Sequence, residues 1–254
     1  MIATIEHSKG NFKVDFSRPL DISVPVSADG PQAWYVNKPV IAPVINRYFT
    51  GSVRLGGAVN FNNVSFNPHG HGTHTETVGH IARESFPISI AMKKYLHHAM
   101  LISVTPHIVT QDAGYIQKGD AIVTQQQLMA AIGDNRPEAL VIRTLPNSKD
   151  KPTKNYSNTN FCYIEAQALD LLSIFDVQHL LVDLPSVDRE MDGGLLKAHH
   201  AFWQYPHETR AHCTITEFIY VADEIADGEY LLELQVASFE NDAAPSRPVL
   251  YQIF

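Results

Sequence analysis

Short apolar runs and amphipathic stretches alternate through the middle of the chain. The apolar runs predict buried strands over Met100–Thr105, Ala139–Thr144 and His179–Leu184. Thr124–Ile132 predicts a helix, because Thr124 can cap it and Gln127, three residues later, completes a capping box. Asn160–Phe175 predicts a second helix with Leu169, Leu172 and Phe175 on one face. This strand–helix–strand order is typical of an α/β fold.

The ends of the chain have a different pattern. A first strand is expected within Leu20–Val26. Two further strands, Thr214–Val221 and Tyr230–Phe239, are joined by a short link and predict an antiparallel addition. Pro248–Phe254 is expected at the edge of the sheet, because proline cannot donate to a ladder. The segment Lys93–His98 is expected to be the polar face of a short helix.

Composition narrows the class of protein. Apolar residues make up 44% of the 254 residues, which suffices for a packed core, and even turn spacing favours one domain over residues 1–254. The net charge of −8 and the scattered basic residues argue against a nucleic-acid partner. The two cysteines fit a reducing compartment, and no apolar run approaches a membrane span. We therefore expect a cytoplasmic protein that acts on a small molecule and not at a membrane.

Histidine is concentrated in one segment. Four of the 13 histidines, together with one carboxylate, fall within residues 69 to 80, and they are His69, His71, His74, Glu76 and His80. Imidazole and carboxylate are the ligand set of zinc, manganese or iron rather than of calcium or magnesium. The alternative interpretation is a glycine-rich surface loop in which the histidines have no common function. The density and mixture of ligands favour a metal site.

The backbone of this segment indicates how its ligands meet. Its glycines and threonines make a long helix unfavourable. In an extended chain, residues i and i+2 point to the same side, so His74 and Glu76 are expected to converge. Gly70 and Gly72 can form a tight turn that brings His69 to the same point.

The segment resembles the cyclase or kynurenine formamidase-like family of metal-dependent hydrolases, which includes isatin hydrolases. The family signature is H-x-G-T-H-x-D-x-P-x-H. Gly72-Thr73-His74 matches its centre, His80 matches its last histidine, and Asp21-Ile22-Ser23 looks like the family's first strand. There are departures: Glu76 stands for Asp and Val78 for Pro, and strict register puts Gly70 at the first histidine. We predict His69 as that ligand, with His71 as the alternative.

The resemblance also implies a second metal held by a histidine and a glutamate from the C-terminal half. Here it points to Glu217 and to His199, with His200 as the alternative, because neighbouring side chains face different ways. It assigns His80 as the acid/base residue, and the alternative is a further metal ligand. The implied fold is the α/β cyclase-family fold, swivelling β/β/α-like, with a mixed central sheet and flanking helices.

The predicted function is hydrolysis of an arylformamide or cyclic amide bond in a small, aromatic substrate by metal-activated water. The predicted cofactor is a divalent metal, Zn²⁺ first and Mn²⁺ second, as one or two ions, and family habit suggests a homodimer. The alternatives are a non-catalytic metal-binding protein and a metal-dependent lyase or dehydratase. Arg143 is a candidate for binding a substrate carboxylate, but a surface ion pair is the favoured interpretation. The core is the favoured place for aromatic residues. Those that could instead line an apolar pocket are Trp34, Tyr35, Phe202 and Trp203.

Overall fold

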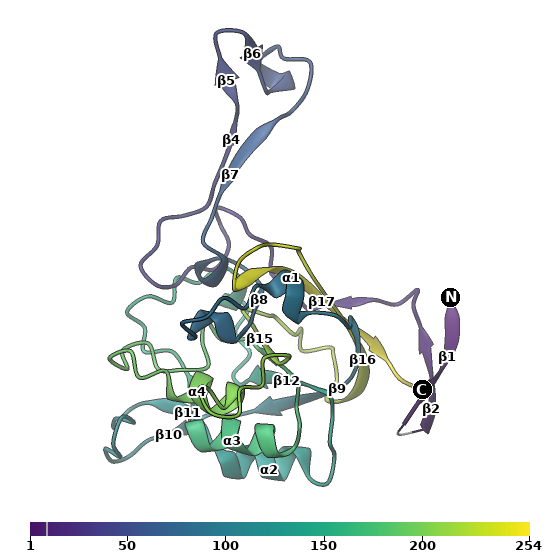
Figure 1. The fold of residues 1–254 in the computed structure, drawn as a ribbon, viewed down its shortest axis with the longest axis vertical. Helices are drawn as coiled ribbons and strands as arrows, with labels where there is room; N and C mark the ends of the chain where they lie inside the picture. Colours follow the sequence, from purple (N-terminus) through teal and green to yellow (C-terminus); the bar gives the residue numbers. More distant parts are fainter. Residues whose placement is uncertain (9) are drawn as a thin grey trace.

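A closed sheet forms the centre of the molecule in the computed structural model, which describes residues 1–8 and 10–254. Its strands follow the order β16-β9-β12-β14-β15-β8-β17-β3, and a further pairing of β16 with β17 closes them into a barrel (Figure 1). The strands are β3 (Leu20–Asp21), β8 (His74–Glu76), β9 (Leu96–Val104), β12 (Ala139–Thr144), β14 (His179–Val182), β15 (Thr214–Glu217), β16 (Gly228–Val236) and β17 (Ala243–Gln252). The mixed central sheet confirms the predicted fold class.

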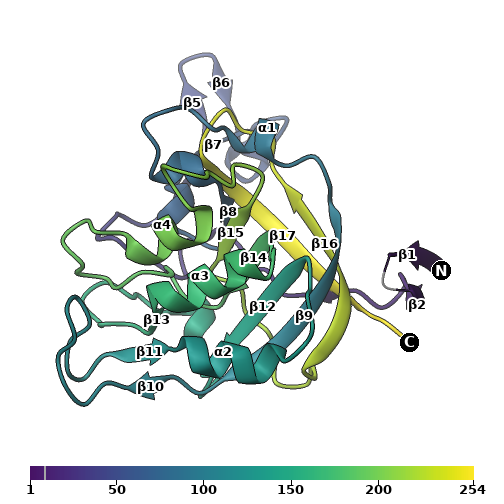
Figure 2. The ribbon, with the colours of Figure 1, turned by 60° about the horizontal axis from the view of Figure 1, so that its bottom comes forward.

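The middle of the sheet is parallel. Strands β9, β12, β14 and β15 run in one direction, whereas β8, β16 and β17 pair with their neighbours antiparallel. Helix α2 (Gln125–Ile132) precedes β12, helix α3 (Ala166–Ile174) precedes β14, and helix α4 (Lys197–Trp203) precedes β15. All three helices cover the same face of the sheet (Figure 2). The expected alternation of strand and helix is therefore present. Of the two strands expected as an antiparallel addition, β16 pairs antiparallel with its neighbours, whereas β15 continues the parallel part beside β14.

Each face of the sheet carries its own apolar cluster, because side chains alternate along a strand. Leu101, Val141 and Leu181 point into the barrel and belong to the inner cluster. Leu180 and Ile215 point outward and pack with the helices in the outer cluster. A strand residue can therefore be assigned to the barrel interior or to the helix-covered face by its register.

Arg143 closes one end of the barrel interior. It lies two residues after Val141 and therefore faces inward. Its guanidinium donates to the carbonyl oxygens of Ala222 (2.8 Å) and Ile225 (2.9 Å) and pairs with Asp227 (3.0 Å). With its donors engaged in this way, Arg143 has a structural role, and the structure does not support it as a substrate ligand.

The two helix predictions have different outcomes. Helix α2 begins after Thr124, whose hydroxyl accepts from the backbone of Gln127, and the capping box is complete. The helix predicted over Asn160–Phe175 begins only at Ala166. The preceding residues form the short strand β13 (Tyr163–Ile164), which pairs with β11 (Ala121–Val123). Both β13 residues are fully buried, so tertiary pairing overrides the helical pattern.

Three other element predictions are corrected. The helix expected over Lys93–His98 is wrong, because β9 begins at Leu96 and His97 and His98 lie in the ladder with β16. The C-terminal strand is not at an edge, because β17 pairs with β16 on one side and with β8 and β3 on the other. The first strand is limited to Leu20–Asp21.

Other elements flank the barrel. The remaining strands are β1 (Ile2–His7), β2 (Gly10–Asp15), β4 (Val40–Pro43), β5 (Ile45–Asn46), β6 (Phe49–Thr50), β7 (Asn62–Ser65) and β10 (His107–Ile108). The short helices are η1 (Val53–Leu55), η2 (Pro68–Gly70), η3 (Val78–His80), η4 (Lys151–Thr153) and α1 (Ile88–Ala91). Within the described residues, every helix is too short or too polar to cross a membrane.

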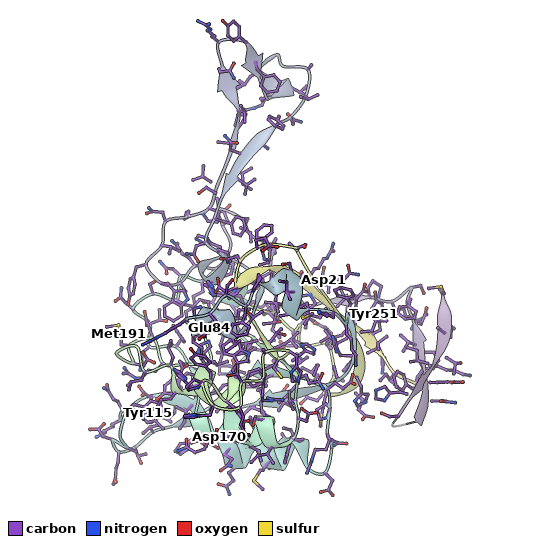
Figure 3. All side chains as sticks on the ribbon, in the orientation of Figure 1. Asp21, Glu84, Tyr115, Asp170, Met191 and Tyr251 are labelled. Carbon is purple, nitrogen blue, oxygen red and sulfur yellow. The ribbon has the colours of Figure 1, made fainter. Side chains whose placement is uncertain are left out.

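Residues 40–65, called the arm below, form a long hairpin that stands away from the barrel (Figure 1). Its side chains project on all sides at a distance from the body of the molecule (Figure 3).

Candidate metal centre

The histidine-rich segment follows a folded path around strand β8. The side chain of Asn67 accepts the Gly70 N–H at 3.0 Å and starts η2, and the hydroxyl of Thr77 accepts the Gly79 N–H at 3.1 Å and starts η3. Gly72 has a φ of +67°, and a Cβ there would lie 2.9 Å from the carbonyl oxygen of Val24. Only glycine fits this turn without strain. The two short helices therefore place residues on either side of β8 within reach of its side chains.

The first group of candidate ligands is His69, His74 and Glu76. One atom from each lies within 4.8 Å of the others, and Nδ1 of His69 lies 3.0 Å from Oε2 of Glu76. His74 and Glu76 are fully buried. By contrast, Nδ1 of His71 accepts a hydrogen bond from the Asn67 backbone, and among the described residues His71 belongs to none of the clusters of candidate metal ligands. The geometry brings His69, and not His71, to Glu76.

Two donor atoms in this group have the environment of metal ligands. Within the described part of the chain, Nε2 of His74 and Oε2 of Glu76 are buried and have no hydrogen-bond partner. Nε2 of His74 does lie 3.4 Å from Oε2 of Glu217, and Nδ1 of His69 faces Glu76, but neither pair has the alignment of a hydrogen bond. Buried polar atoms without partners cost free energy. A cation between these atoms would satisfy them, so the residues present fit a metal ion.

The second group lies on the other side of the Glu76 carboxylate. Nε2 of His199 is 3.1 Å from Oε1 of Glu76 and 4.0 Å from Oε1 of Glu217. The carboxylate of Asp188 holds the opposite nitrogen of the His199 ring at 2.6 Å and also accepts the backbone N–H groups of Ala198 and His199. Asp188 therefore both starts helix α4 and aims Nε2 at Glu76, as carboxylates do behind metal-binding histidines.

His199 and its neighbour His200 are separated by the helix geometry. Nδ1 of His200 lies 3.0 Å from the carbonyl oxygen of Tyr205, away from Glu76. The ring of Trp203 lies 5.5 Å from the His199 ring and packs against it in the core.

His80 lies at the rim of this centre beside a carboxylate that sequence reasoning missed. Nδ1 of His80 is 3.6 Å from Oδ2 of Asp242 and 4.0 Å from Oε2 of Glu76, and its ring stacks on His69 with centroids 4.2 Å apart. Asp242 also lies 2.8 Å from Nε2 of His69. His80 is 30% exposed, so a solute can reach it. Asp242 comes from the loop before β17, and no motif near it marks it as functional.

The charges of the centre favour a cation. Burial alone would raise the pKa of Glu76, but the charge of His80 and the hydrogen bond from His199 hold it well below its usual range. The hydrogen bond from His69 and the nearby ring of His80 likewise lower the pKa of Asp242. Burial lowers the pKa of His69, yet Asp242 and Glu76 together raise it to about 10. The carboxylates are thus ionised, and His69 holds a proton that a metal ion can replace.

The four aromatic residues considered for an apolar pocket do not form one, and two of them lie in the core, which is the interpretation that the sequence favoured. Phe202 and Trp203 are fully buried in the outer cluster. Trp34 packs edge-on against Phe161, and Tyr35 is exposed with its hydroxyl on Glu190 at 2.9 Å. The structure does not gather these four rings around the candidate ligands.

Comparison with solved structures gives the same fold. A structure described as a "potential metal-dependent hydrolase with cyclase activity" matches with a TM-score of 0.65 and 14% identity, over 92% of this chain and 97% of the other. Isatin hydrolase A from Ralstonia solanacearum matches at 0.61 and 15%, over 92% and 91%. An isatin hydrolase bound to the product analogue thioisatinate matches at 0.59 and 12%, over 92% of each chain. The barrel with its helix layer is therefore the fold of these hydrolase structures.

A family model assigns the chain more closely. The model Cyclase, described as "Putative cyclase", matches residues 17–189. This match spans more than half of the chain, so the protein belongs to the Cyclase family, as the sequence resemblance predicted.

Proposed function

We propose that this protein is a metal-dependent hydrolase that cleaves a non-peptide amide bond, that of an arylformamide or a cyclic amide, in a small aromatic substrate. The observation that carries the proposal is the convergence of two groups of nitrogen and oxygen ligand atoms on the carboxylate of Glu76. Two of these atoms, Nε2 of His74 and Oε2 of Glu76, are buried and have no hydrogen-bond partner. Membership of the Cyclase family and the fold shared with isatin hydrolases support the same class of reaction.

In this proposal His69, His74 and Glu76 hold one cation. The other oxygen of Glu76 faces His199, and a second cation would be held by His199 and Glu217. When bound, such a cation makes hydroxide available near neutral pH and polarises the carbonyl under attack. The N/O donor set suits Zn²⁺ and, as the alternative, Mn²⁺.

His80 is proposed to move the proton. An amine is a poor leaving group until it is protonated, and imidazole exchanges protons near neutral pH. His80 has its Nδ1 near the carboxylate of Asp242 and an exposed edge from which a leaving nitrogen can be reached. The Asp242 carboxylate lies 3.6 Å from Nδ1 and is proposed to orient the ring.

The test is a metal and activity assay on the purified protein. Elemental analysis is expected to give one or two transition-metal ions per chain, and turnover of an N-formyl aromatic amine or an isatin-like lactam is expected to stop with chelator and return with Zn²⁺ or Mn²⁺. Bound metal without turnover of either substrate would favour the non-catalytic alternative. Activity that survives complete metal removal would refute the proposal.

A homodimer is part of the proposal, and the arm supports it. An isolated two-stranded hairpin is marginally stable in water. The arm exposes many large apolar side chains, namely Val40, Ile41, Ile45, Tyr48, Phe49, Val53, Leu55, Val59, Phe61 and Val64. A second copy of the chain is a partner that would cover them, since a concentration of apolar surface of this kind marks an interaction site.

A further inference from the structure

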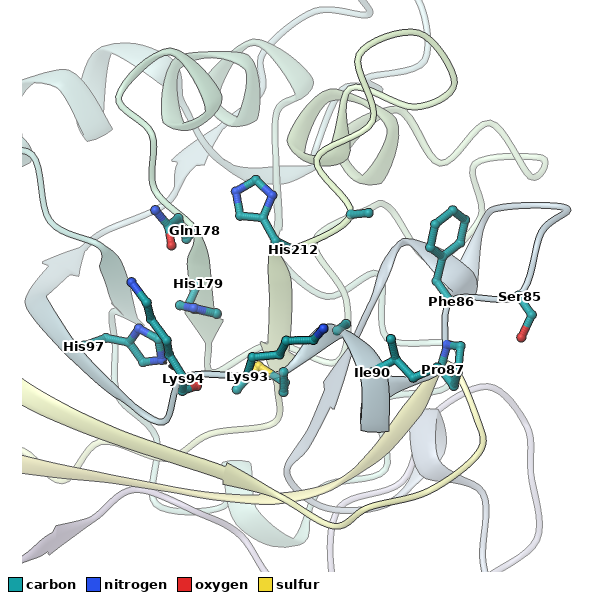
Figure 4. A pocket seen from close by; sticks show the side chains of 13 residues that line it. Ser85, Phe86, Pro87, Ile90, Lys93, Lys94, His97, Gln178, His179 and His212 are labelled. Carbon is teal, nitrogen blue, oxygen red and sulfur yellow. Dashed lines mark hydrogen bonds between the residues drawn. The ribbon is translucent and has the colours of Figure 1, made fainter.

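A second cavity lies at the rim of the barrel, at the amino-terminal ends of β14 and β15. Its volume is about 550 Å³, within the range of pockets that hold small organic molecules. His97 and His179 lie side by side at one end, Lys93 and Lys94 follow one side, and Phe86 lies at the opposite end (Figure 4).

The register of the strands separates this cavity from the candidate metal centre. His97 shares a face of β9 with Leu101, and His179 shares a face of β14 with Leu181, so both rings point toward the barrel interior. Glu217 shares a face of β15 with Ile215 and points to the helix layer. Glu217 also lies at the carboxyl-terminal end of its strand. The histidine end of the cavity and Glu217 are therefore on opposite faces of the sheet and toward opposite strand ends.

The buried end of the cavity has fixed polar groups. The rings of His97 and His179 have centroids 4.0 Å apart, and both side chains are almost fully buried. Nδ1 of His179 lies 2.8 Å from the hydroxyl of Thr214, and Nε2 of His97 lies 3.2 Å from the carbonyl oxygen of Lys94. These contacts orient both rings before any ligand arrives. Outside the lining, the charge of Glu138 acts on His97.

The rim is cationic and the wall is apolar. Lys93, Lys94 and His212 are exposed at the rim, and no aspartate or glutamate is among the described residues that line the cavity. This is a local positive charge in a chain with a net charge of −8. The wall opposite the histidines is formed by Phe86, Ile90 and Met92 together with their neighbours.

We infer that this cavity is a second ligand site, which binds a small organic carboxylate with an apolar body. The carboxylate faces Lys93, Lys94 and His212, and the apolar body lies against Phe86 and Ile90. An apolar pocket with a few convergent polar groups at the mouth of a barrel is a common form of ligand site. The inference does not depend on the metal centre or on the proposed reaction.

The test compares 4-phenylbutyrate with its neutral amide by isothermal titration calorimetry. The wild-type protein and Glu76→Gln are expected to bind the acid equally, and both are expected to bind the amide about 10-fold more weakly or worse. The double variant Lys93→Glu/Lys94→Glu is expected to lose about 10-fold or more in affinity for the acid. The matched control, Lys118→Glu/Lys149→Glu, changes the same charge at exposed lysines elsewhere and is expected to bind normally.

The position of the bound acid is determined separately from its affinity. With the methionine methyl groups labelled with ¹³C, the Met92 signal, assigned with Met92→Leu, is expected to shift on addition of the acid. Equal binding of acid and amide would overturn the inference, and so would equal loss in both lysine variants. Binding that disappears in Glu76→Gln would place the acid at the metal centre and would also overturn it. An unchanged Met92 signal at saturation has the same consequence.

Discussion

Oε1 of Glu76 lies 3.1 Å from Nε2 of His199, although the two residues are 123 positions apart in the sequence. Glu76 belongs to β8, inside the sheet, and His199 to α4 in the helix layer. The other oxygen of the same carboxylate faces His69 at 3.0 Å. One side chain thus serves both groups of candidate ligands.

Glu76→Gln should lower both metal content and activity. Glutamine has the same size but no charge, and its amide cannot accept at both positions. We expect less bound metal by elemental analysis and turnover reduced by at least ~100-fold, more than is usual for residues behind the ligands. Glu224→Gln, an exposed site, is the control and should match wild type. Full metal occupancy in Glu76→Gln would show that this carboxylate is not a ligand.

Asp188→Asn should weaken metal binding, although Asp188 is not itself a proposed ligand. The carboxylate holds Nδ1 of His199 at 2.6 Å and fixes the ring. Its loss is expected to reduce metal affinity by about 10- to 100-fold. Competition with a coloured chelator measures this. An affinity within about twofold of wild type would mean that helix α4 alone orients the ring.

His80→Ala should separate catalysis from metal binding. If His80 transfers the proton to the leaving amine, turnover is lost while metal content stays near the wild-type value. The contacts of His80 with Glu76 and Asp242 also permit a ligand role. Loss of metal together with activity would assign His80 as a ligand.

Asp120→Asn should destabilise the fold in a pH-dependent way. Burial alone would raise the pKa of Asp120, but hydrogen bonds hold it below its usual value of 3.8. The bonds come from the Gln117 backbone and from the side chains of Arg189, Tyr163 and Asn160. At pH 7 the substitution is expected to cost ~3 kcal/mol in the free energy of unfolding, as for other broken buried pairs.

The sign of this pH dependence follows from the lowered pKa. The folded state keeps the Asp120 carboxylate ionised at pH values where the unfolded chain binds a proton, so the contribution is complete above about pH 4 and is lost below it. Urea unfolding at pH 7 and pH 3 should show that the difference in the free energy of unfolding between wild type and variant becomes smaller at pH 3. Asp134→Asn, at an exposed site, should show no such difference. A constant difference at all pH values would contradict this account.

Removing apolar side chains from the arm should dissociate the proposed dimer. Tyr48→Ser/Leu55→Ser replaces two exposed side chains of the arm. We expect a monomer by light scattering where the wild type is a dimer, with the thermal unfolding of the barrel little changed. Ile174→Ser, which removes an equally exposed apolar side chain from α3, should leave the dimer intact. A wild-type monomer at micromolar concentration would refute the dimer itself.

Local sequence signals predicted the parts of the fold that depend on local chemistry. The capping box at Thr124 and the buried run Ala139–Thr144 are specified by neighbouring residues, and both are present. Residues Tyr163–Ile164 were mispredicted because their pairing with β11 is remote in sequence. The same limit applies to the site. The spacing of His74 and Glu76 placed them together, but Asp242 and the barrel-rim cavity arise only when distant segments meet.

The bridge from Glu76 to His199 has a mechanical consequence. A cation held there would join the sheet to the layer of helices, acting as a removable cross-link. Since binding to the native state adds to its stability, stripping the metal should loosen α4 more than the barrel wall. The rate of hydrogen exchange in helix α4 would then report the metal occupancy of the centre.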